Sequence, residues 1–302
     1  MALFRCENLT MTLGAFQLKN ISFSLEPGQV LGVVGINGCG KTTLLRTILG
    51  SYRLGQEDRG ELTLEKLHFQ RDVKGYREQM AYVLQSNPFS EFMQPFEVGE
   101  RYGYYYPGFN QKKYRELLKQ YEVPAKKMIT ELSKGQILRM QMAFALSYPA
   151  KLYVFDEPVG NLDVEFRDAF YETIRELTAG EESAVILSSH VVTELERVAD
   201  GLLWLGKKQE KGFVRFFGTT DELKNRYRLL TVDDEAARAI PKEMIRGRRL
   251  RENHREFLLY REDGDFTQTI KEMSFLTREQ RIDLRFPDLQ EIMYFVEKEE
   301  IS

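Results

Sequence analysis

The residue types and spacing best suited to chemistry lie in one stretch, Gly35-Ile36-Asn37-Gly38-Cys39-Gly40-Lys41-Thr42-Thr43. It reads G-x-x-x-x-G-K-T, in which the glycines let the backbone curl so that successive N–H groups point inward at phosphate oxygens. Lys41 would reach the terminal phosphates of a nucleotide, and the Thr42 hydroxyl would ligate Mg²⁺. An apolar strand over 29–34 and a helix over 41–49 are expected on either side, and the helix adds the positive end of its dipole. The sequence therefore predicts a phosphate-binding loop.

Two carboxylates, Asp156 and Glu157, follow a second apolar run over 151–155. That run has the pattern of a buried strand, and acidic side chains at its end are costly unless they have a role. Asp156 is placed to hold Mg²⁺ through water, and Glu157 to polarise an attacking water. A surface turn with two acids is the simpler alternative, which the phosphate-binding loop upstream disfavours.

Two more polar side chains follow apolar runs that read as strands. Gln85 follows the run over 80–84, and its amide oxygen would ligate the metal and sense the γ-phosphate. His190 follows the run over 183–189 and would contact the γ-phosphate or orient the water. Taken alone, Gln85 reads equally as an ordinary loop residue, and His190 as a core or surface histidine.

The segments around these motifs have patterns of their own. Residues 1–34 alternate apolar and polar side chains, which predicts antiparallel strands. Phe16 lies between them and would stack on adenine, although a plain core phenylalanine fits as well. Residues 90–148 read mostly as helix, over 111–121 and 134–146 in particular. The aromatic run over 102–109 is either a docking surface or packing within this helical part.

One more polar segment opens a predicted helix, Leu132-Ser133-Lys134-Gly135-Gln136. Because a helix N-terminus presents free N–H groups and a positive dipole, the segment is a second potential anion site.

The composition limits the class of protein. The chain has 302 residues, 42% of them hydrophobic and 29% charged, which is typical of one large or two smaller globular domains. Lys and Arg (43) nearly balance Asp and Glu (46), so the charge gives no argument for a nucleic-acid partner. No apolar stretch approaches a membrane span and the start is no secretory signal, so we expect an intracellular protein. Cys6 and Cys39 are too few for a disulfide framework. Oxidation of Cys39 would block the phosphate-binding loop, but a small packing residue is the simpler interpretation.

From about residue 221 the motifs stop. We expect a small α+β appendage over 221–302, with strands over 227–232, 244–250, 256–260 and 281–285 and helices over 235–240, 267–273 and 289–298. The basic run over 246–251 would touch anionic lipid or, more simply, form a solvated strand edge.

Taken in this order, the motifs resemble the nucleotide-binding domain of an ABC transporter over about residues 1–228. Gly35 to Thr42 matches Walker A, Gln85 the Q-loop, Leu132 to Gln136 the signature motif, Val154-Phe155-Asp156-Glu157 Walker B, Asn161-Leu162-Asp163 the D-loop and His190 the switch histidine. Lys134 replaces the commoner Gly of the signature motif, and Leu13 stands where many members carry the adenine-stacking Tyr.

The resemblance implies an α/β fold: a phosphate-loop NTPase core with a mixed sheet and flanking helices, an antiparallel β-subdomain and a helical subdomain over about 90–148. It places the ATPase domain at 1–220. It also implies ATP and Mg²⁺ as cofactors and an ATPase whose catalytic residues are Glu157, His190 and Gln85, with Thr42, Gln85 and Asp156 at the metal.

The resemblance further implies that two such domains close head to tail. ATP on Lys41 of one would be capped by Ser133 and Gly135 of the other, with Gln136 and Asp163 also at the nucleotide. The second domain is another copy or a different chain. The remaining partners are transmembrane permease subunits, which would hold the protein at the inner face of the cell membrane.

Within the family, the single phosphate loop, the Ser188-Ser189-His190 ending and the C-terminal extension look most like ATPase subunits of the ABC-2 exporter type. That type includes subunits linked to antimicrobial-peptide or antibiotic export. The alternative is a soluble ABC ATPase that acts on ribosomes or DNA. A nucleotide-binding regulator without catalysis would require Glu157 or His190 to be dispensable.

Overall fold

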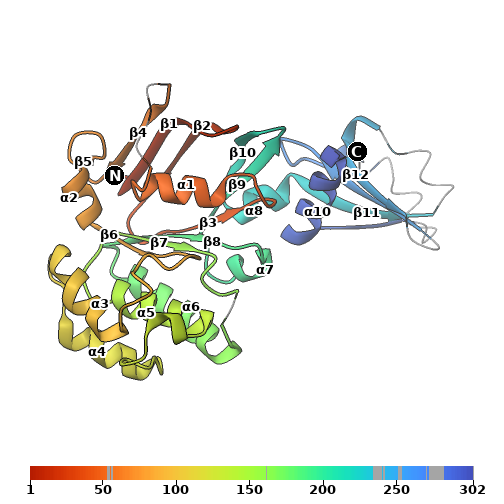
Figure 1. The fold of residues 1–302 in the computed structure, drawn as a ribbon. Helices are drawn as coiled ribbons and strands as arrows, with labels where there is room; N and C mark the ends of the chain where they lie inside the picture. Colours follow the sequence, from red (N-terminus) through yellow and green to blue (C-terminus); the bar gives the residue numbers. More distant parts are fainter. Residues whose placement is uncertain are drawn as a thin grey trace. The chain divides into compact units, whose positions relative to one another are not determined.

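The computed structural model describes residues 1–52, 55, 57–160, 162–233, 240, 242–250, 254–269, 271 and 282–301. Contacts divide the chain into two compact units, Met1–Phe217 and Gly218–Ser302 (Figure 1). Asn161 and residues 235–239 of one expected helix lie outside the described residues, as do 270, 272 and 273 of the helix expected over 267–273, whose described residues 267–269 and 271 are helical. In the part of the chain that is described, no helix is long and apolar enough to cross a membrane.

A mixed sheet forms the centre of the first unit. Its strands are β1 (Phe4–Leu13), β2 (Phe16–Leu25), β3 (Val30–Val34), β4 (Arg59–Leu64), β5 (Leu67–His68), β6 (Met80–Val83), β7 (Leu152–Asp156), β8 (Ala184–Ser188), β9 (Gly201–Lys208) and β10 (Lys211–Gly218). Within the described residues their order is β5-β4-β1-β2-β10-β9-β3-β8-β7-β6. This sheet confirms the predicted α/β fold.

The sheet has an antiparallel and a parallel part. β1 pairs antiparallel with β2 and with β4, whereas β6, β7, β8, β3 and β9 pair parallel in that order. Every residue of β3, β7 and β8 is buried. Continuous apolar strands of this kind are the pattern of a parallel sheet covered on both faces, which explains why all three were recognisable from the sequence.

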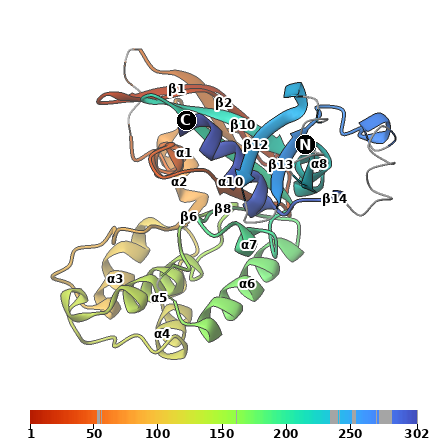
Figure 2. The ribbon, with the colours of Figure 1, turned by 90° about the vertical axis from the view of Figure 1, so that its right-hand side faces the viewer.

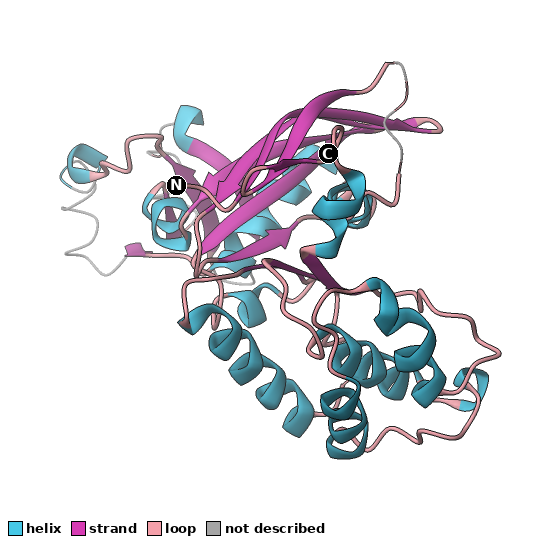
Figure 3. Cartoon of the chain, turned by 90° about the vertical axis from the view of Figure 1, so that its left-hand side faces the viewer, coloured by secondary structure: helices cyan, strands magenta, loops and turns pink. Residues whose placement is uncertain are grey.

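The helices of the first unit are α1 (Lys41–Ile48), α2 (Val73–Glu78), α3 (Pro95–Tyr102), α4 (Gln111–Gln120), α5 (Lys134–Ala145), α6 (Val164–Ala179) and α7 (Val192–Leu195), with short 3₁₀ turns η1 (Gly103–Tyr105) and η2 (Ile129–Glu131). Figures 1 and 2 show α3, α4 and α5 as a group on the opposite side of β6 and β7 from β1 and β2. In Figure 3 the group of α3, α4 and α5 consists of cyan helices joined by pink loops, whereas magenta strands lie in the other part, together with further helices. The predicted helices over 111–121 and 134–146 are confirmed as α4 and α5.

The aromatic run over 102–109 has some side chains packed within the helical part and others on the surface. The rings of Tyr106 and Phe109 pack on Phe144 of α5, at centroid distances of 5.3 and 5.0 Å. Tyr104 and Tyr105 instead lie on the surface, 89% and 67% exposed. Packing therefore accounts for one part of the run and leaves two tyrosines without a place in the core.

The second unit is a four-stranded antiparallel sheet with helices. Its elements are α8 (Thr220–Asn225), β11 (Tyr227–Val232), η4 (Lys242–Met244), β12 (Ile245–Leu250), β13 (Arg255–Tyr260), β14 (Ile282–Arg285) and α10 (Leu289–Ile301). The strand order in the described residues is β12-β13-β11-β14, and the predicted strands of this segment are confirmed. Leu230, Leu259 and Phe266 belong to its buried core.

Residues 246–250 of the basic run lie on β12, an edge strand of this small sheet in the described residues. Arg249 forms an ion pair with Glu256 of β13, and the Arg246 guanidinium lies 5.0 Å from the centre of the Tyr260 ring. Charged side chains on an edge strand protect it from pairing with other chains. The contacts therefore fit the simpler interpretation of the run as a solvated strand edge.

Candidate functional site

The predicted phosphate-binding loop connects β3 to α1, and its glycines are required by its geometry. Gly35 has φ +146, and a Cβ there would lie 2.4 Å from the carbonyl oxygen of Leu205. Gly40 has φ +106, and a Cβ there would lie 2.6 Å from a methyl group of Leu18. Both positions combine a backbone conformation that L side chains rarely adopt with a contact too close for a Cβ. Only glycine fits either position.

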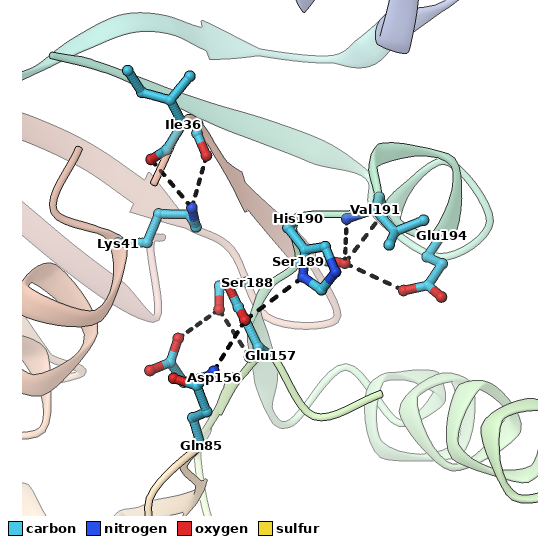
Figure 4. Close-up of polar contacts among 11 residues, drawn as sticks. Ile36, Lys41, Gln85, Asp156, Glu157, Ser188, Ser189, His190, Val191 and Glu194 are labelled. Carbon is cyan, nitrogen blue, oxygen red and sulfur yellow. Dashed lines mark hydrogen bonds and ion pairs between the residues drawn. The ribbon is translucent and has the colours of Figure 1, made fainter. Parts of the chain in front are cut away.

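Lys41 points into this loop. Its side chain is 6% exposed, and its ammonium donates to the carbonyl oxygens of Gly35, at 2.7 Å, and Ile36, at 3.5 Å (Figure 4). Asn37, Gly38 and Thr42 are exposed, whereas Thr43 is partly and Cys39 fully buried. The burial of the Cys39 thiol fits the interpretation of a small packing residue.

The other predicted side chains meet at one edge of the sheet. β6, β7, β8 and β3 are parallel, so the residues that follow them lie at their common carboxyl end, where α/β sheets bind ligands. Here Gln85 Nε2 lies 3.4 Å from Glu157 Oε2, and His190 Nδ1 lies 3.6 Å from the same oxygen (Figure 4). The structure thus brings an amide, a carboxylate and an imidazole, from three segments far apart in the sequence, to one point.

Asp156 and Glu157 are oriented by Ser188, a residue to which the sequence analysis gave no role. Asp156 is 1% exposed, and its Oδ1 accepts a hydrogen bond from Ser188 Oγ at 2.7 Å. The same hydroxyl oxygen accepts the Glu157 N–H at 3.0 Å. A buried carboxylate held by one hydroxyl retains oxygen lone pairs for a further donor or a metal-bound water. A serine at the end of an apolar strand was the only signal in the sequence.

The segment that carries His190 is also anchored. Ser189 Oγ donates to Glu194 Oε2 of α7 at 3.2 Å, and Glu194 is 8% exposed. Its other oxygen lies 3.3 Å from an amino group of Arg167 on α6. Glu194 and Arg167 were missed by the sequence analysis, because an ordinary Glu and Arg on two helices give no local sign that they meet.

A cavity of about 620 Å³ lies against the phosphate-binding loop. Phe16 lines it together with Lys41, Thr42, Gln85 and Glu157, which places an aromatic ring in the same space as the phosphate-binding and carboxylate groups. Leu13, Asn37, Gly38, Gly40, Thr43, Lys207 and Glu210 complete the described lining. The cavity can hold a polyphosphate on the loop and a base near Phe16. The carboxylate of Glu157 lines the same space.

Lys207 and Glu210 come from the β9–β10 hairpin and were not predicted. Their charged groups are 3.3 Å apart, and the Lys207 ammonium lies 6.0 Å from the centre of the Phe16 ring. β10 pairs with β2 at Lys211 and Gln17, which brings the hairpin to the cavity. This long-range pairing has no counterpart in the local sequence pattern.

The predicted second anion site is the N-terminus of α5. Ser133 is its N-cap, with Oγ accepting the Gln136 N–H at 3.2 Å, and Gln136 Oε1 accepts the Ser133 N–H at 3.0 Å. This reciprocal capping box begins the helix. Ser133 is exposed and Gly135 partly exposed. Among the described residues that line the 620 Å³ cavity, neither Ser133, Gly135 nor Gln136 is present.

Asp163 is likewise absent from the described lining of that cavity. It is the N-cap of α6, where Oδ1 accepts the Phe166 N–H at 2.9 Å, and it forms an ion pair with Arg139 of α5. The Phe166 N–H lowers the pKa of the Asp163 carboxyl, and the nearby Arg139 adds to the effect. Asp163 therefore stays ionised and ties α5 to α6.

Comparisons with known proteins agree with this geometry. A sequence model described as ABC transporter matches residues 18–160. The chain is 32% identical over 216 residues to the ABC-type transporter ATP-binding protein EcsA of Bacillus subtilis (strain 168), covering 70% of this chain and 84% of EcsA. It is 30% identical over 234 residues to the zinc import ATP-binding protein ZnuC of Pseudomonas savastanoi pv. phaseolicola, covering 72% of this chain and 82% of that protein.

The fold is also similar to a solved structure. A dimeric ATP-binding cassette, MJ0796, bound to ADP and Pi in a post-hydrolysis state, superimposes with a TM-score of 0.61 at 20% sequence identity. The match covers 72% of this chain and 98% of that one. At this identity the likeness concerns the fold of the cassette.

Proposed function

The chain belongs to the ATP-binding proteins of ABC transporters and is an ATPase, and from this we propose that it binds Mg-ATP at the phosphate-binding loop and couples hydrolysis to separate permease subunits. The observation that carries the proposal is the cluster of Gln85, Glu157 and His190 at the sheet edge that also carries the loop. Gln85 Nε2 and His190 Nδ1 lie 3.4 and 3.6 Å from Glu157 Oε2. Steady-state phosphate release from purified protein, with and without Mg²⁺, tests the proposal. Rates no higher than those of heat-denatured protein would refute it.

The nucleotide would lie in the cavity beside the loop. Lys41 and the N–H groups at the start of α1 supply positive charge to the phosphates. The Phe16 ring, which lines the same cavity, would stack on adenine. We propose Phe16 for this contact, a choice that the family resemblance alone left open.

The residues present fit a magnesium ion that arrives with the nucleotide. Thr42 offers an exposed hydroxyl and Asp156 a carboxylate held in place by Ser188, and Gln85 offers an amide oxygen at the same edge. Such sites hold Mg²⁺ through few protein oxygens plus phosphates and waters. When bound, the ion neutralises charge on the transferred phosphate.

The hydrolytic step would centre on Glu157. Its carboxylate would take a proton from the attacking water, His190 would orient that water or the γ-phosphate, and Gln85 would link the carboxylate to the metal. The Gln85 amide and the His190 imidazole both approach Glu157 Oε2, at 3.4 and 3.6 Å, and Glu157 lines the cavity beside the loop. We therefore assign Glu157, His190 and Gln85 as the catalytic set.

We propose a head-to-tail dimer, as the family resemblance implies. The described cavity lining contains none of Ser133, Gly135, Gln136 and Asp163, and Ser133 is exposed at the start of α5. A second ATP-binding domain would present these groups to the γ-phosphate, since a helix N-terminus binds anions well. The partner is a second copy or a different chain of the same family.

Ser133→Ala is expected to raise the ATP concentration needed for dimer formation by roughly 10- to 100-fold, because a hydrogen bond to a charged phosphate is lost. The affinity of the monomer for ATP should not change. Light scattering over an ATP titration measures the first quantity, and calorimetry on diluted protein the second.

Ser133→Ala also removes a helix cap, so its control must do the same elsewhere. Thr219→Ala breaks an equivalent capping box, in which Thr219 Oγ accepts the Glu222 N–H at 3.1 Å. Each loss costs about 1 kcal/mol of helix stability. If monomer affinity falls with Ser133→Ala, or if Thr219→Ala impairs dimerisation equally, Ser133 does not cap a partner's nucleotide.

A groove of about 900 Å³ fits the proposed permease partner. Its lining includes Tyr82 of β6, Leu84 just after that strand, and three further tyrosines, Tyr104, Tyr105 and Tyr106. Exposed aromatic rings at a groove are typical of binding hot spots. Because the Leu84 backbone directly precedes Gln85, a permease helix seated here would lie beside the catalytic edge.

The double substitution Tyr104→Ala, Tyr105→Ala is expected to weaken permease binding by at least about 10-fold, since two exposed rings lose their contact area. ATPase activity of the isolated subunit should be unchanged. Leu250→Ala, which truncates a side chain that is 75% exposed on β12, is the control. Full co-purification with membrane subunits in mild detergent despite the tyrosine changes would contradict this docking surface.

Within the family we propose an ABC-2 type exporter subunit, held at the inner face of the membrane by its permease. Support comes from the Ser188-Ser189-His190 ending and from the separate C-terminal unit. Because an import ATPase is among the similar proteins, direction must be measured. Uptake of a candidate substrate into inside-out vesicles that carry the co-purified permease would support export if it requires external ATP. Accumulation of that substrate by intact cells would refute export.

A further inference from the structure

Gln141 is a buried polar residue in the middle of α5. Its side chain is 2% exposed. Oε1 accepts the Leu84 N–H at 2.9 Å, and Nε2 donates to the Leu84 carbonyl oxygen at 3.1 Å. A buried amide is costly unless both of its ends are hydrogen-bonded. Here both ends of the amide are hydrogen-bonded to the backbone of one residue, Leu84, so the Gln141 side chain fixes the position of that residue.

Leu84 directly precedes a proposed catalytic residue, Gln85. Leu84 follows β6 and precedes Gln85, which is exposed and reaches Glu157 Oε2 at 3.4 Å. Adjacent Cα atoms are fixed about 3.8 Å apart, so a shift of Leu84 is passed to Gln85. Gln141 therefore limits where the Gln85 amide can lie.

The other end of α5 carries Ser133. Eight residues separate Ser133 from Gln141, about 12 Å of helix at 1.5 Å per residue. A hydrogen-bonded helix moves as a rigid body over that length. Displacement of the α5 N-terminus is thus transmitted to Leu84.

We propose that Gln141 is a positioning residue that sets the place of Gln85 and couples it to α5. When Ser133 caps the nucleotide of a second domain, the displacement of α5 would then shift Gln85 at the chain's own ATP site, through Gln141 and Leu84. The coupling between the two sites rests on the proposed dimer, whereas the placement of Gln85 does not. Gln141 touches no reacting group in this scheme.

Gln141→Met is expected to lower kcat by roughly 10- to 100-fold, the effect of misplacing a catalytic group by about 1 Å. It keeps the length of the side chain and removes both hydrogen bonds, and ATP affinity should remain. In a Gln85→Ala background, Gln141→Met should cause no further loss of kcat. Equal losses in both backgrounds, or an unchanged kcat, would overturn the proposal.

Tyr148→Phe is the matched control. Tyr148 follows α5, is 4% exposed, and donates to the Met80 carbonyl oxygen at 3.0 Å. It therefore joins the same segment to the start of β6, away from Gln85. Tyr148→Phe should keep kcat within about twofold; a loss equal to that of Gln141→Met would mean that α5 packing in general, and not Gln141, governs kcat. If Gln141→Met does not fold, Gln141→Asn breaks the same two hydrogen bonds with a shorter polar side chain.

Amide hydrogen exchange gives a readout without ATP. Peptides that cover 80–86 should exchange faster in Gln141→Met than in the wild type, because the Leu84 N–H loses its acceptor. If the wild type hydrolyses no ATP, the proposed function fails by itself. If the wild type hydrolyses ATP and exchange changes while kcat does not, the positioning role fails by itself.

Discussion

Glu157→Gln is expected to lower kcat for ATP hydrolysis by roughly 10²- to 10⁴-fold, the usual contribution of a general base. The amide has the size of the carboxylate but cannot take a proton from water. Lys41 and the phosphate-binding loop are untouched, so ATP should still bind. Single-turnover phosphate release and equilibrium ATP binding measure the two quantities separately.

Glu116→Gln provides the control for this change. Glu116 lies on α4 with a side chain that is 65% exposed, 3.9 Å from Lys112, and its substitution alters the same charge far from the sheet edge. The control should hydrolyse ATP at the wild-type rate. If Glu157→Gln also does so, Glu157 is not the base; if it loses ATP binding, its role is in holding the nucleotide.

Lys41→Ala is expected to weaken ATP binding by at least about 100-fold, because the phosphates lose their one buried cation in the described part of the cavity lining. The loop also loses the hydrogen bonds from the ammonium to Gly35 and Ile36. Both effects weaken ATP binding itself, which precedes hydrolysis. Because the proposed dimer requires bound ATP, no dimer should form at any practical ATP concentration. Binding of a fluorescent ATP analogue measures the loss.

Lys112→Ala, which removes an exposed α4 side chain, should bind ATP like the wild type. Thermal unfolding would show whether Lys41→Ala is still folded. A folded Lys41→Ala protein with near wild-type affinity would show that the nucleotide does not bind at this loop.

The phosphate-binding loop and the two carboxylates could be predicted because each has a local signal in the sequence. The phosphate-binding loop combines obligatory glycines with an apolar strand and a helix, and Asp156 and Glu157 end a strand that is apolar throughout. Parallel strands share their carboxyl edge, so residues at three strand ends had to meet there. The sequence analysis gave Gln85, Glu157 and His190 separate roles at the nucleotide, and their contacts with one another appear only in the structure.

The supporting residues could not be predicted, because their roles depend on long-range contacts. Ser188, Glu194 and Gln141 are ordinary residues in sequence, and each acquires its partner only when the sheet and helices assemble. The β9–β10 hairpin reaches the cavity through pairing with β2, about 190 residues earlier in the chain. No local pattern encodes such a pairing.

The long helix α6 was also missed, for a different reason. Its start carries a signal, the N-cap Asp163, and its buried side chains Phe170, Tyr171 and Ile174 follow helical spacing. The signal was present, but the sequence analysis assigned no element to residues 164–179.

The most direct test of the account is size-exclusion chromatography with light scattering on Glu157→Gln, with and without Mg-ATP. This variant should keep ATP and stop at the closed state, so that ATP becomes part of the interface between two domains. We predict a monomer without nucleotide and a dimer with Mg-ATP. A protein that binds Mg-ATP and remains a monomer at all concentrations would contradict a head-to-tail dimer of two copies of this chain.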